Sequence, residues 1–296
     1  MGYAGTTKSI RQIADELNVG VLVEGSVQVV GGGLRVNVQL IDALTDEHMW
    51  AESYDRKLDD AFAIQRDIAQ RIVAEVGAAL GRSERDALAK VPTNNPEAYR
   101  LYLQGREYQA RPGYQRQNFE IAQQLYGRAI TLDPEFALAH AVLSEVHGMM
   151  HWFRYDTSPQ RVALQREAAE TALRLAPDLP QSHLAMGLMY YWGHRDYRRA
   201  LDAFAIAQNG LPNDSRVVEV IGYVHRRLGN WDEVFAAYKK ATDLDPRNAN
   251  LFFDLGGGSL MHVRRYADAV QALEKALELA PDFHRAAVRR GWMFIR

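Results

Sequence analysis

Apolar residues recur with two different periods along the chain, and the change of period divides it into two parts. Residues 8–18 have the amphipathic pattern of a short helix. Residues 20–30 and 34–43 are rich in β-branched side chains that alternate with polar ones, and glycines lie between the two runs. This pattern predicts a hairpin. A third strand is predicted at 47–55, and an amphipathic helix at about 58–80.

Residues 81–96 separate this part from the rest of the chain. They are polar and contain proline and asparagine, as is typical of a linker. The apolar pattern that follows has the period of helices. We therefore expect a small α/β domain at 1–80, a linker at 81–96 and a helical domain at 97–296.

The helical part repeats itself. Pro177, Pro212, Pro246 and Pro281 are 35, 34 and 35 residues apart, and Pro134 ends a similar segment. Five residues before each of these prolines stands an alanine, and ten residues after it stands a small residue. The alanines are Ala129, Ala172, Ala207, Ala241 and Ala276, and the small residues are Ser144, Gly187, Gly222, Gly256 and Gly291. Because small residues let two helices approach closely and proline ends a helix, the pattern predicts a stack of helical hairpins.

These positions resemble the tetratricopeptide repeat. Its signature is present as Met186-Gly187-x₂-Tyr190, then Ala200-x₃-Phe204, then Pro212. The resemblance covers about residues 95–296. It implies a mainly α protein, with a right-handed superhelical solenoid of five full hairpins and one half behind a small α/β domain with a three-stranded sheet. Two features depart from the pattern: Gln165 stands where alanine is usual, and extra residues around 155–159 form a longer loop. That loop is either a decoration or a gate.

The N-terminal part resembles a TolB-like domain, also compared with the flagellar FlgO family. The resemblance lies in Glu24-Gly25-Ser26-Val27, Leu40-Ile41-Asp42-Ala43 and Trp50-Ala51-Glu52-Ser53-Tyr54-Asp55. In bacteria, this domain and the repeats that follow it usually lie C-terminal to a winged-helix or other helix-turn-helix regulator, a Ser/Thr kinase or a nucleotide cyclase. The family domain also begins with a strand and a helix that the first residues here do not match. The resemblance therefore implies an incomplete domain in a fragment of a bacterial signalling protein.

The resemblance also implies a binding surface. The first helix of each hairpin faces the concave side of the stack, and one stripe of that helix looks into the groove. Aromatic and arginine side chains on this stripe are the usual anchors of interfaces. The candidate groove residues are Tyr99, Tyr102, Arg106, Leu184, Leu188, Tyr191, Trp192, Glu219, Tyr223, Arg226, Arg227, Asn250, Phe253 and Met261.

Composition and motifs argue against other classes of function. A net charge of −2 gives no electrostatic reason to expect nucleic acid, and the absence of cysteine excludes thiolate chemistry. His140, His147 and His151 share a helical face, but repeat packing explains them without a metal. No nucleophile with a positioned base can be singled out. We therefore expect no catalytic residue, no cofactor and no metal.

The expected function is a non-catalytic scaffold or sensory region that binds a protein or peptide in its concave groove. The alternatives are a regulatory portion of a kinase, nucleotide cyclase or transcription regulator, and a cell-envelope assembly module. No apolar run is long enough to span a membrane. We expect a cytoplasmic location, or a periplasmic one if a membrane span lies upstream.

The C-terminal helix is a second expected contact surface. Trp292 and Phe294 are predicted to lie on a face that no further helix covers, whereas Arg285 is predicted to face water. An exposed aromatic patch favours association. We expect weak self-association through this helix.

Overall fold

The computed structural model describes residues 3, 6–30, 33–57, 61–77 and 91–293. The chain forms two compact units, Met1–Pro96 and Glu97–Arg296. Residues 81–90 of the predicted linker lie outside the described residues.

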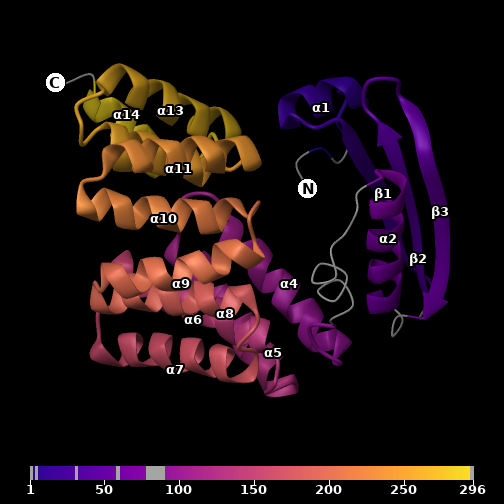
Figure 1. The fold of residues 1–296 in the computed structure, drawn as a ribbon, viewed down its shortest axis with the longest axis horizontal. Helices are drawn as coiled ribbons and strands as arrows, with labels where there is room; N and C mark the ends of the chain where they lie inside the picture. The colour runs from indigo at the N-terminus through magenta and orange to yellow at the C-terminus, as the bar shows by residue number, and fades with distance from the viewer. Residues whose placement is uncertain (1–2, 4–5, 31–32, 58–60, 78–90, 294–296) are drawn as a thin grey trace. The chain divides into compact units, whose positions relative to one another are not determined.

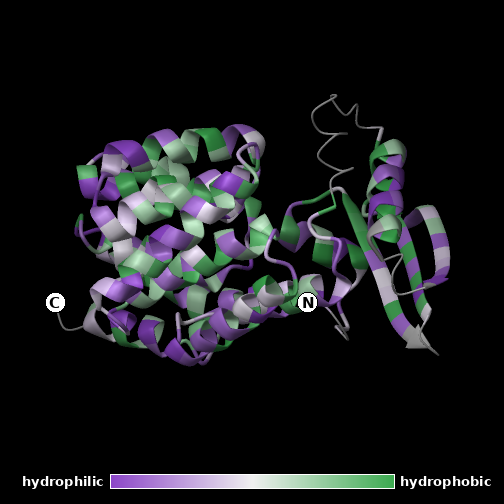
Figure 2. Cartoon of the chain, turned by 90° about the horizontal axis from the view of Figure 1, so that it is seen from below, coloured by the Kyte–Doolittle hydropathy of each residue, from purple (hydrophilic) through white to green (hydrophobic). Residues whose placement is uncertain are grey.

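In its described residues, the first unit is a three-stranded antiparallel sheet with two helices. Its elements are α1 (Ile10–Leu17), β1 (Val21–Val30), β2 (Gly33–Asp42), β3 (Glu47–Lys57) and α2 (Ala61–Glu75), and the strand order is β1-β2-β3. Ser9 begins α1 with a reciprocal cap, in which its hydroxyl accepts the Gln12 N–H and the Gln12 amide oxygen accepts the Ser9 N–H. Figure 2 shows hydrophobic and hydrophilic residues alternating along the strands, as a half-buried sheet requires.

One face of this sheet is only partly covered. Ile64, Ile68 and Ile72 of α2 pack on residues of β2 and β3, among them Leu40 and Trp50. In β1, Val23 pairs with Leu40 and Val27 pairs with Val36, so these two valines share the apolar face. They are nevertheless 51% and 65% exposed. Among the described residues of this unit, α2 therefore covers the β2–β3 side of the sheet and does not cover Val23 and Val27 of β1.

The second unit is a stack of helical hairpins. Its elements in chain order are α4 (Pro96–Ala110), α5 (Arg116–Leu132), α6 (Ala137–Trp152), α7 (Pro159–Leu175), α8 (Pro180–Leu188), η2 (Met189–His194), α9 (Tyr197–Gly210), α10 (Ser215–Leu228), α11 (Trp231–Leu244), α12 (Ala249–Leu255), η3 (Gly256–Leu260), α13 (Tyr266–Leu279) and α14 (His284–Met293). Figure 1 shows α7, α9, α10, α11 and α13 stacked one above the next. The first helices of the third and fifth hairpins end in the π-helical turns η2 and η3.

The repeated alanines and Gly187 lie where helices meet. The five repeated alanines of the second helices are fully buried: Ala129, Ala172, Ala207, Ala241 and Ala276. A Cβ on Gly187 would lie 2.3 Å from a ring carbon of Phe204, which is itself fully buried. Glycine is therefore required for α8 and α9 to approach this closely.

The departure at Gln165 is accommodated in the same way. Gln165 is fully buried, and a Cβ on Gly148 of the preceding helix would lie 2.4 Å from its amide nitrogen. Because Gly148 has no side chain, the larger side chain of Gln165 fits between the two helices, and α6 and α7 stay in contact.

The predicted fold class is confirmed: a helical-repeat solenoid follows a three-stranded antiparallel sheet. The predicted strands and first helix of this unit agree with β1 to β3 and α1 to within a few residues at each end, and α2 lies within the helix predicted at about 58–80, of which residues 58–60 and 78–80 lie outside the described residues.

Candidate functional site

The first helices of three hairpins, α6, α10 and α12, bring a polar cluster together inside the repeat stack. Arg216 of α10 is at its centre. Its guanidinium donates to the Glu145 carboxylate of α6, with an Nε–Oε1 distance of 2.8 Å, and to the Glu219 carboxylate at 2.6 Å. It also donates to the Tyr223 hydroxyl at 3.2 Å, which in turn donates to the Asp254 carboxylate of α12 at 3.1 Å. Residues 145, 216, 219, 223 and 254 are called the central cluster below.

The central cluster holds more acid than base. It contains three carboxylates and one guanidinium: Glu145 and Glu219, which are 8% and 4% exposed, pair with Arg216, and Asp254 accepts from the Tyr223 hydroxyl. Burial raises the pKa of Glu219 to about 7; Arg216 opposes this shift, and the charge of Asp254 adds to it. Glu219 therefore exchanges its proton near neutral pH.

Two further arginines of α10 lie on the same side of the helix as Arg216, Glu219 and Tyr223. Arg226 donates to the backbone oxygen of Gly258 in η3 at 2.9 Å, and its guanidinium lies 5.6 Å from the centre of the Tyr223 ring. Arg227 donates to the Tyr191 hydroxyl at 3.3 Å and lies 4.9 Å from the centre of the Trp152 ring. These cations are held over aromatic faces, which favour them electrostatically.

The turn at residues 111–115, between α4 and α5, lies against this surface. The Gly113 N–H donates to the side-chain oxygen of Asn250 at 3.1 Å, and the Tyr114 hydroxyl donates to Asp254 at 2.7 Å. Tyr155, from the extra loop of the second hairpin, donates to the backbone oxygen of Tyr114 at 2.8 Å. The long loop thus contributes a contact inside the stack.

The prediction that Arg285 faces water is wrong. Its guanidinium donates to the Tyr155 hydroxyl at 2.7 Å and lies 5.0 Å from the centre of the Phe153 ring. The loop around 155, longer than the repeat requires, brings both aromatic rings to α14 and provides a partner that the helical pattern of α14 did not reveal.

The structure places the sequence-predicted groove residues at different depths. Eight are buried: Tyr102, Leu184, Leu188, Tyr191, Trp192, Glu219, Tyr223 and Asn250. Tyr99, Arg226, Phe253 and Met261 are partly buried, and Arg106 and Arg227 are exposed. The structure brings Glu219 and Tyr223 together in the central cluster and Asn250 and Phe253 together beside Tyr114. Arg106 is bonded to Tyr102, within its own helix.

Sequence reasoning missed Glu145, Arg216, Asp254, Tyr114 and Tyr155. A signal existed for one of them: Glu145 follows Pro134 by the same interval at which Tyr223 follows Pro212. Extending the groove stripe to the second hairpin finds this glutamate. Tyr114 and Tyr155 lie in turns, where helical periodicity carries no information about position.

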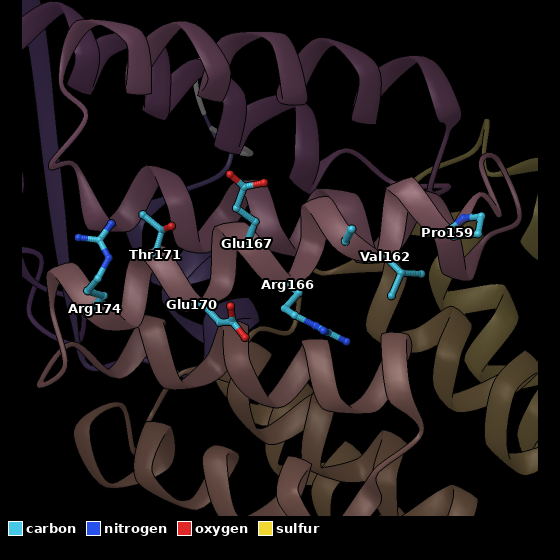
Figure 3. A pocket seen from close by; sticks show the side chains of 8 residues that line it. Pro159, Val162, Arg166, Glu167, Glu170, Thr171 and Arg174 are labelled. Carbon is cyan, nitrogen blue, oxygen red and sulfur yellow. The ribbon is translucent and has the colours of Figure 1, made fainter.

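The outer surface of the stack offers less chemistry. A shallow depression on α7 is lined by Arg166, Glu167, Glu170 and Arg174, and Figure 3 shows these side chains pointing in different directions rather than toward one point. Within the described ranges, no group of three or more His, Asp or Glu side chains is placed to hold a metal. None of the described helices is both long and apolar enough to cross a membrane.

Comparison with known proteins identifies the repeats. A family model described as "Tetratricopeptide repeat" matches residues 184–249 and 258–296. The structure is also similar to TTC0263, a thermophilic tetratricopeptide-repeat protein of Thermus thermophilus, with a TM-score of 0.55 and 19% sequence identity over 67% of this chain and 100% of that one. The predicted tetratricopeptide repeats are therefore confirmed.

Two curated relatives are larger proteins. The chain is 32% identical over 198 residues to a protein named putative adenylate cyclase 3 of Rhizobium meliloti, a match that covers 65% of this chain and 33% of that one. It is 23% identical over 175 residues to human protein O-mannosyl-transferase TMTC1, covering 57% of this chain and 18% of that one. The chain thus spans about a third or less of the length of these relatives.

Proposed function

We propose that this chain is a non-catalytic, protein- or peptide-binding region of a bacterial signalling protein, and that the inner face of its repeats is the binding surface. Tetratricopeptide repeats generally act as scaffolds for protein contacts. The observation that carries the proposal is that the inner face already holds a short segment of chain, at Gly113 and Tyr114, through both main-chain and side-chain bonds. Peptides are held by grooves in this way.

The central cluster supports binding rather than catalysis. Its carboxylates are engaged by Arg216 and by tyrosine hydroxyls, and most of its members are buried. Such a network fixes the positions of neighbouring helices and leaves no side chain of the cluster poised beside an open substrate cavity.

A regulatory role beside an output domain is the more specific form of the proposal. The similarity to a protein named putative adenylate cyclase 3 favours a cyclase over a kinase or a transcription regulator as that output domain. The TolB-like resemblance of residues 1–80 is compatible with the same arrangement. In this form, ligand binding to the repeats changes the activity of a catalytic domain elsewhere in the protein.

Peptide binding by the wild type and by two matched variants tests the proposal. Candidate ligands are selected from a displayed peptide library with the full chain, and the affinity of each selected peptide is then measured by calorimetry. Phe253→Ala removes a partly buried ring of the inner face, whereas Arg174→Ala removes an exposed side chain of the α7 depression. We expect the first variant to weaken binding by about tenfold or more and the second to leave it unchanged. Equal affinities for both variants and the wild type would contradict the proposal.

A further inference from the structure

The turn at residues 111–115, called the α4–α5 turn, is anchored far along the chain from its own position. Gly113 and Tyr114 bond to Asn250 and Asp254 of α12, which lie 137 and 140 residues further on. Connection of two helices does not require this length, because the turns of the third and fourth hairpins span only residues 195–196 and 229–230. The first hairpin thus has a long turn whose contacts are made with the fifth.

Tyr114 is held by its ring, its hydroxyl and its main chain. Its side chain is 5% exposed. The ring stacks on Phe153 with 4.7 Å between ring centres and lies 6.3 Å from the ring of Phe253. The hydroxyl donates to Asp254, and the backbone oxygen accepts from Tyr155. An aromatic anchor in a pocket with bonded main chain on either side is the usual arrangement of a bound peptide.

The backbone of the turn is held in a conformation that its sequence only partly favours. Gly113 has a φ of 97°, which glycine adopts freely, but Tyr114 has a φ of 51°. A bulky residue rarely adopts this left-handed conformation. Contacts with the second and fifth hairpins therefore hold the turn, as a binding site holds a ligand.

We propose that Asn250, Asp254, Phe253, Phe153 and Tyr155 form a binding site for a tyrosine-containing peptide turn, which the α4–α5 turn occupies as an internal competitor. This inference rests on the proposed function and adds the chemistry of the ligand. The ligand is a protein segment in which a glycine precedes an unmodified tyrosine.

Charge decides against a phosphorylated tyrosine. Asp254 accepts from the hydroxyls of both Tyr114 and Tyr223, and Glu219 and Glu145 lie in the same cluster with Arg216 as their shared partner. A phosphate in place of the Tyr114 hydroxyl would meet Asp254 directly and would lose the donated hydrogen bond. The site therefore selects the neutral phenol.

The tether makes the internal turn a strong competitor. A segment joined to its own site has an effective concentration far above that of a free ligand. A free peptide binds only the fraction of molecules in which the turn is displaced, so its apparent affinity falls in proportion to that fraction. Removing the Tyr114 anchor should therefore increase the affinity for a peptide added from solution.

The chain's own turn supplies the probe. A fluorescent peptide that copies residues 108–119 is titrated against the full chain, and binding is followed by anisotropy. The proteins compared are the wild type, Tyr114→Ala, and Tyr266→Ala as a control that removes a partly buried tyrosine far from the turn in sequence. We expect Tyr114→Ala to bind the peptide about tenfold or more tightly than the other two. The same peptide with a phosphate on the tyrosine that corresponds to Tyr114 should bind none of the proteins.

The inference can fail while the proposed function still holds. Equal binding by the three proteins, no binding by Tyr114→Ala, or equal binding of the phosphorylated peptide overturns it, even where another ligand occupies the inner face. If Tyr114→Ala does not fold, Tyr114→Phe replaces it, because phenylalanine keeps the ring contacts and loses only the bond to Asp254. That variant should bind the peptide more tightly than the wild type by a smaller factor, and equal affinities would again overturn the inference.

Discussion

At the scale of single residues, the repeat depends on positions where no side chain fits. Gly187 lies in α8, where a Cβ would lie 2.3 Å from the ring of the fully buried Phe204. Gly127 of α5 is a matched contrast, because nothing lies within 4 Å of the Cβ it would gain.

The two glycines should respond in opposite ways to the same substitution. Gly187→Ala forces Phe204 out of place, and we expect it to lower the free energy of unfolding by about 1–3 kcal/mol. Gly127→Ala should raise it by about 0.5–1 kcal/mol, because alanine loses less backbone entropy in a helix. Urea unfolding of both variants checks this. A loss of stability from Gly127→Ala would show that the room around the added Cβ does not explain the contrast.

Glu219 should make stability depend on pH. Burial first, and the charge of Asp254 in addition, raise its folded pKa to about 7, whereas in the unfolded chain it has the ordinary value of 4.5. The folded state therefore binds the proton more tightly, and the stabilisation from this proton is complete below the unfolded pKa. It is lost as the pH rises through about 7.

Glu219→Gln separates this contribution from the rest of the protein. Relative to the glutamine variant, the wild type should lose stability between about pH 5 and about pH 8, as measured by the urea midpoint. Glu167→Gln, an exposed change on α7, is the control, and its urea midpoint should equal that of the wild type at both pH values. A wild type that becomes more stable than Glu219→Gln as the pH rises would show that the folded pKa is lowered instead.

Residue types and spacing predicted the repeat but not the partners of individual side chains. The alanines and glycines recur because helix contacts recur, so their burial follows from the period. Arg216 has no such recurrence. Its partners Glu145 and Glu219 lie on two different helices, and one of them is separated from it by 71 residues. The pair with Glu145 depends on the way in which successive repeats are rotated, which periodicity leaves open.

At the scale of elements, Arg216 joins α6 and α10. Its bond to Glu145 crosses from the fourth hairpin to the second, whereas its bond to Glu219 lies within α10, and its side chain is 23% exposed. Arg216→Met would leave two carboxylates without their shared cation.

We expect Arg216→Met to lower the free energy of unfolding by about 3–5 kcal/mol near pH 8, because it leaves buried charges unpaired. The loss should be smaller near pH 5, where Glu219 is protonated. Lys239→Met breaks only an exposed ion pair with Asp243 and should change stability by less than about 1 kcal/mol. Equal losses from both variants in chemical denaturation would show that the Arg216 bonds do not join the helices.

Element boundaries were predicted only in the first unit, and for the repeats the sequence predicted the spacing of the hairpins. Two of the first helices depart from regular α-helix. The π-helical turns η2 and η3 change the period at the ends of two first helices, and η3 provides the backbone oxygen that Arg226 contacts. Insertion of one extra residue per turn is invisible to a pattern of period 3.6.

At the scale of the whole molecule, α14 presents an apolar surface. Val288 and Trp292 are both 55% exposed, and Arg289 lies 5.3 Å from the centre of the Trp292 ring. Phe294, the other aromatic residue of the expected patch, lies outside the described residues.

Weak self-association through α14 therefore stays a prediction with a direct test. Trp292→Glu places a charge in the patch and should shift the sedimentation of concentrated protein toward the monomer. Val27→Glu, an exposed change in β1, should leave it unaffected if α14 is the contact. Association that survives Trp292→Glu would contradict this prediction.

The contact between the first and fifth hairpins is the feature that the sequence least reveals. The contacts of the α4–α5 turn with α12 depend on the summed rotation of four hairpins, so a small error in each would separate the two. The groove was therefore predicted as an open surface, whereas the structure has eight of its candidate residues buried.

Hydrogen–deuterium exchange of the full chain, with and without a ligand selected for binding, tests the central claim most directly. If the inner face is the binding surface, the ligand should slow exchange in the first helices, above all α10 and α12. It should also speed exchange in the α4–α5 turn, where the Gly113 N–H is released from Asn250. Slowed exchange confined to the outer helix α7 or to residues 1–96, with the turn unchanged, would contradict the account.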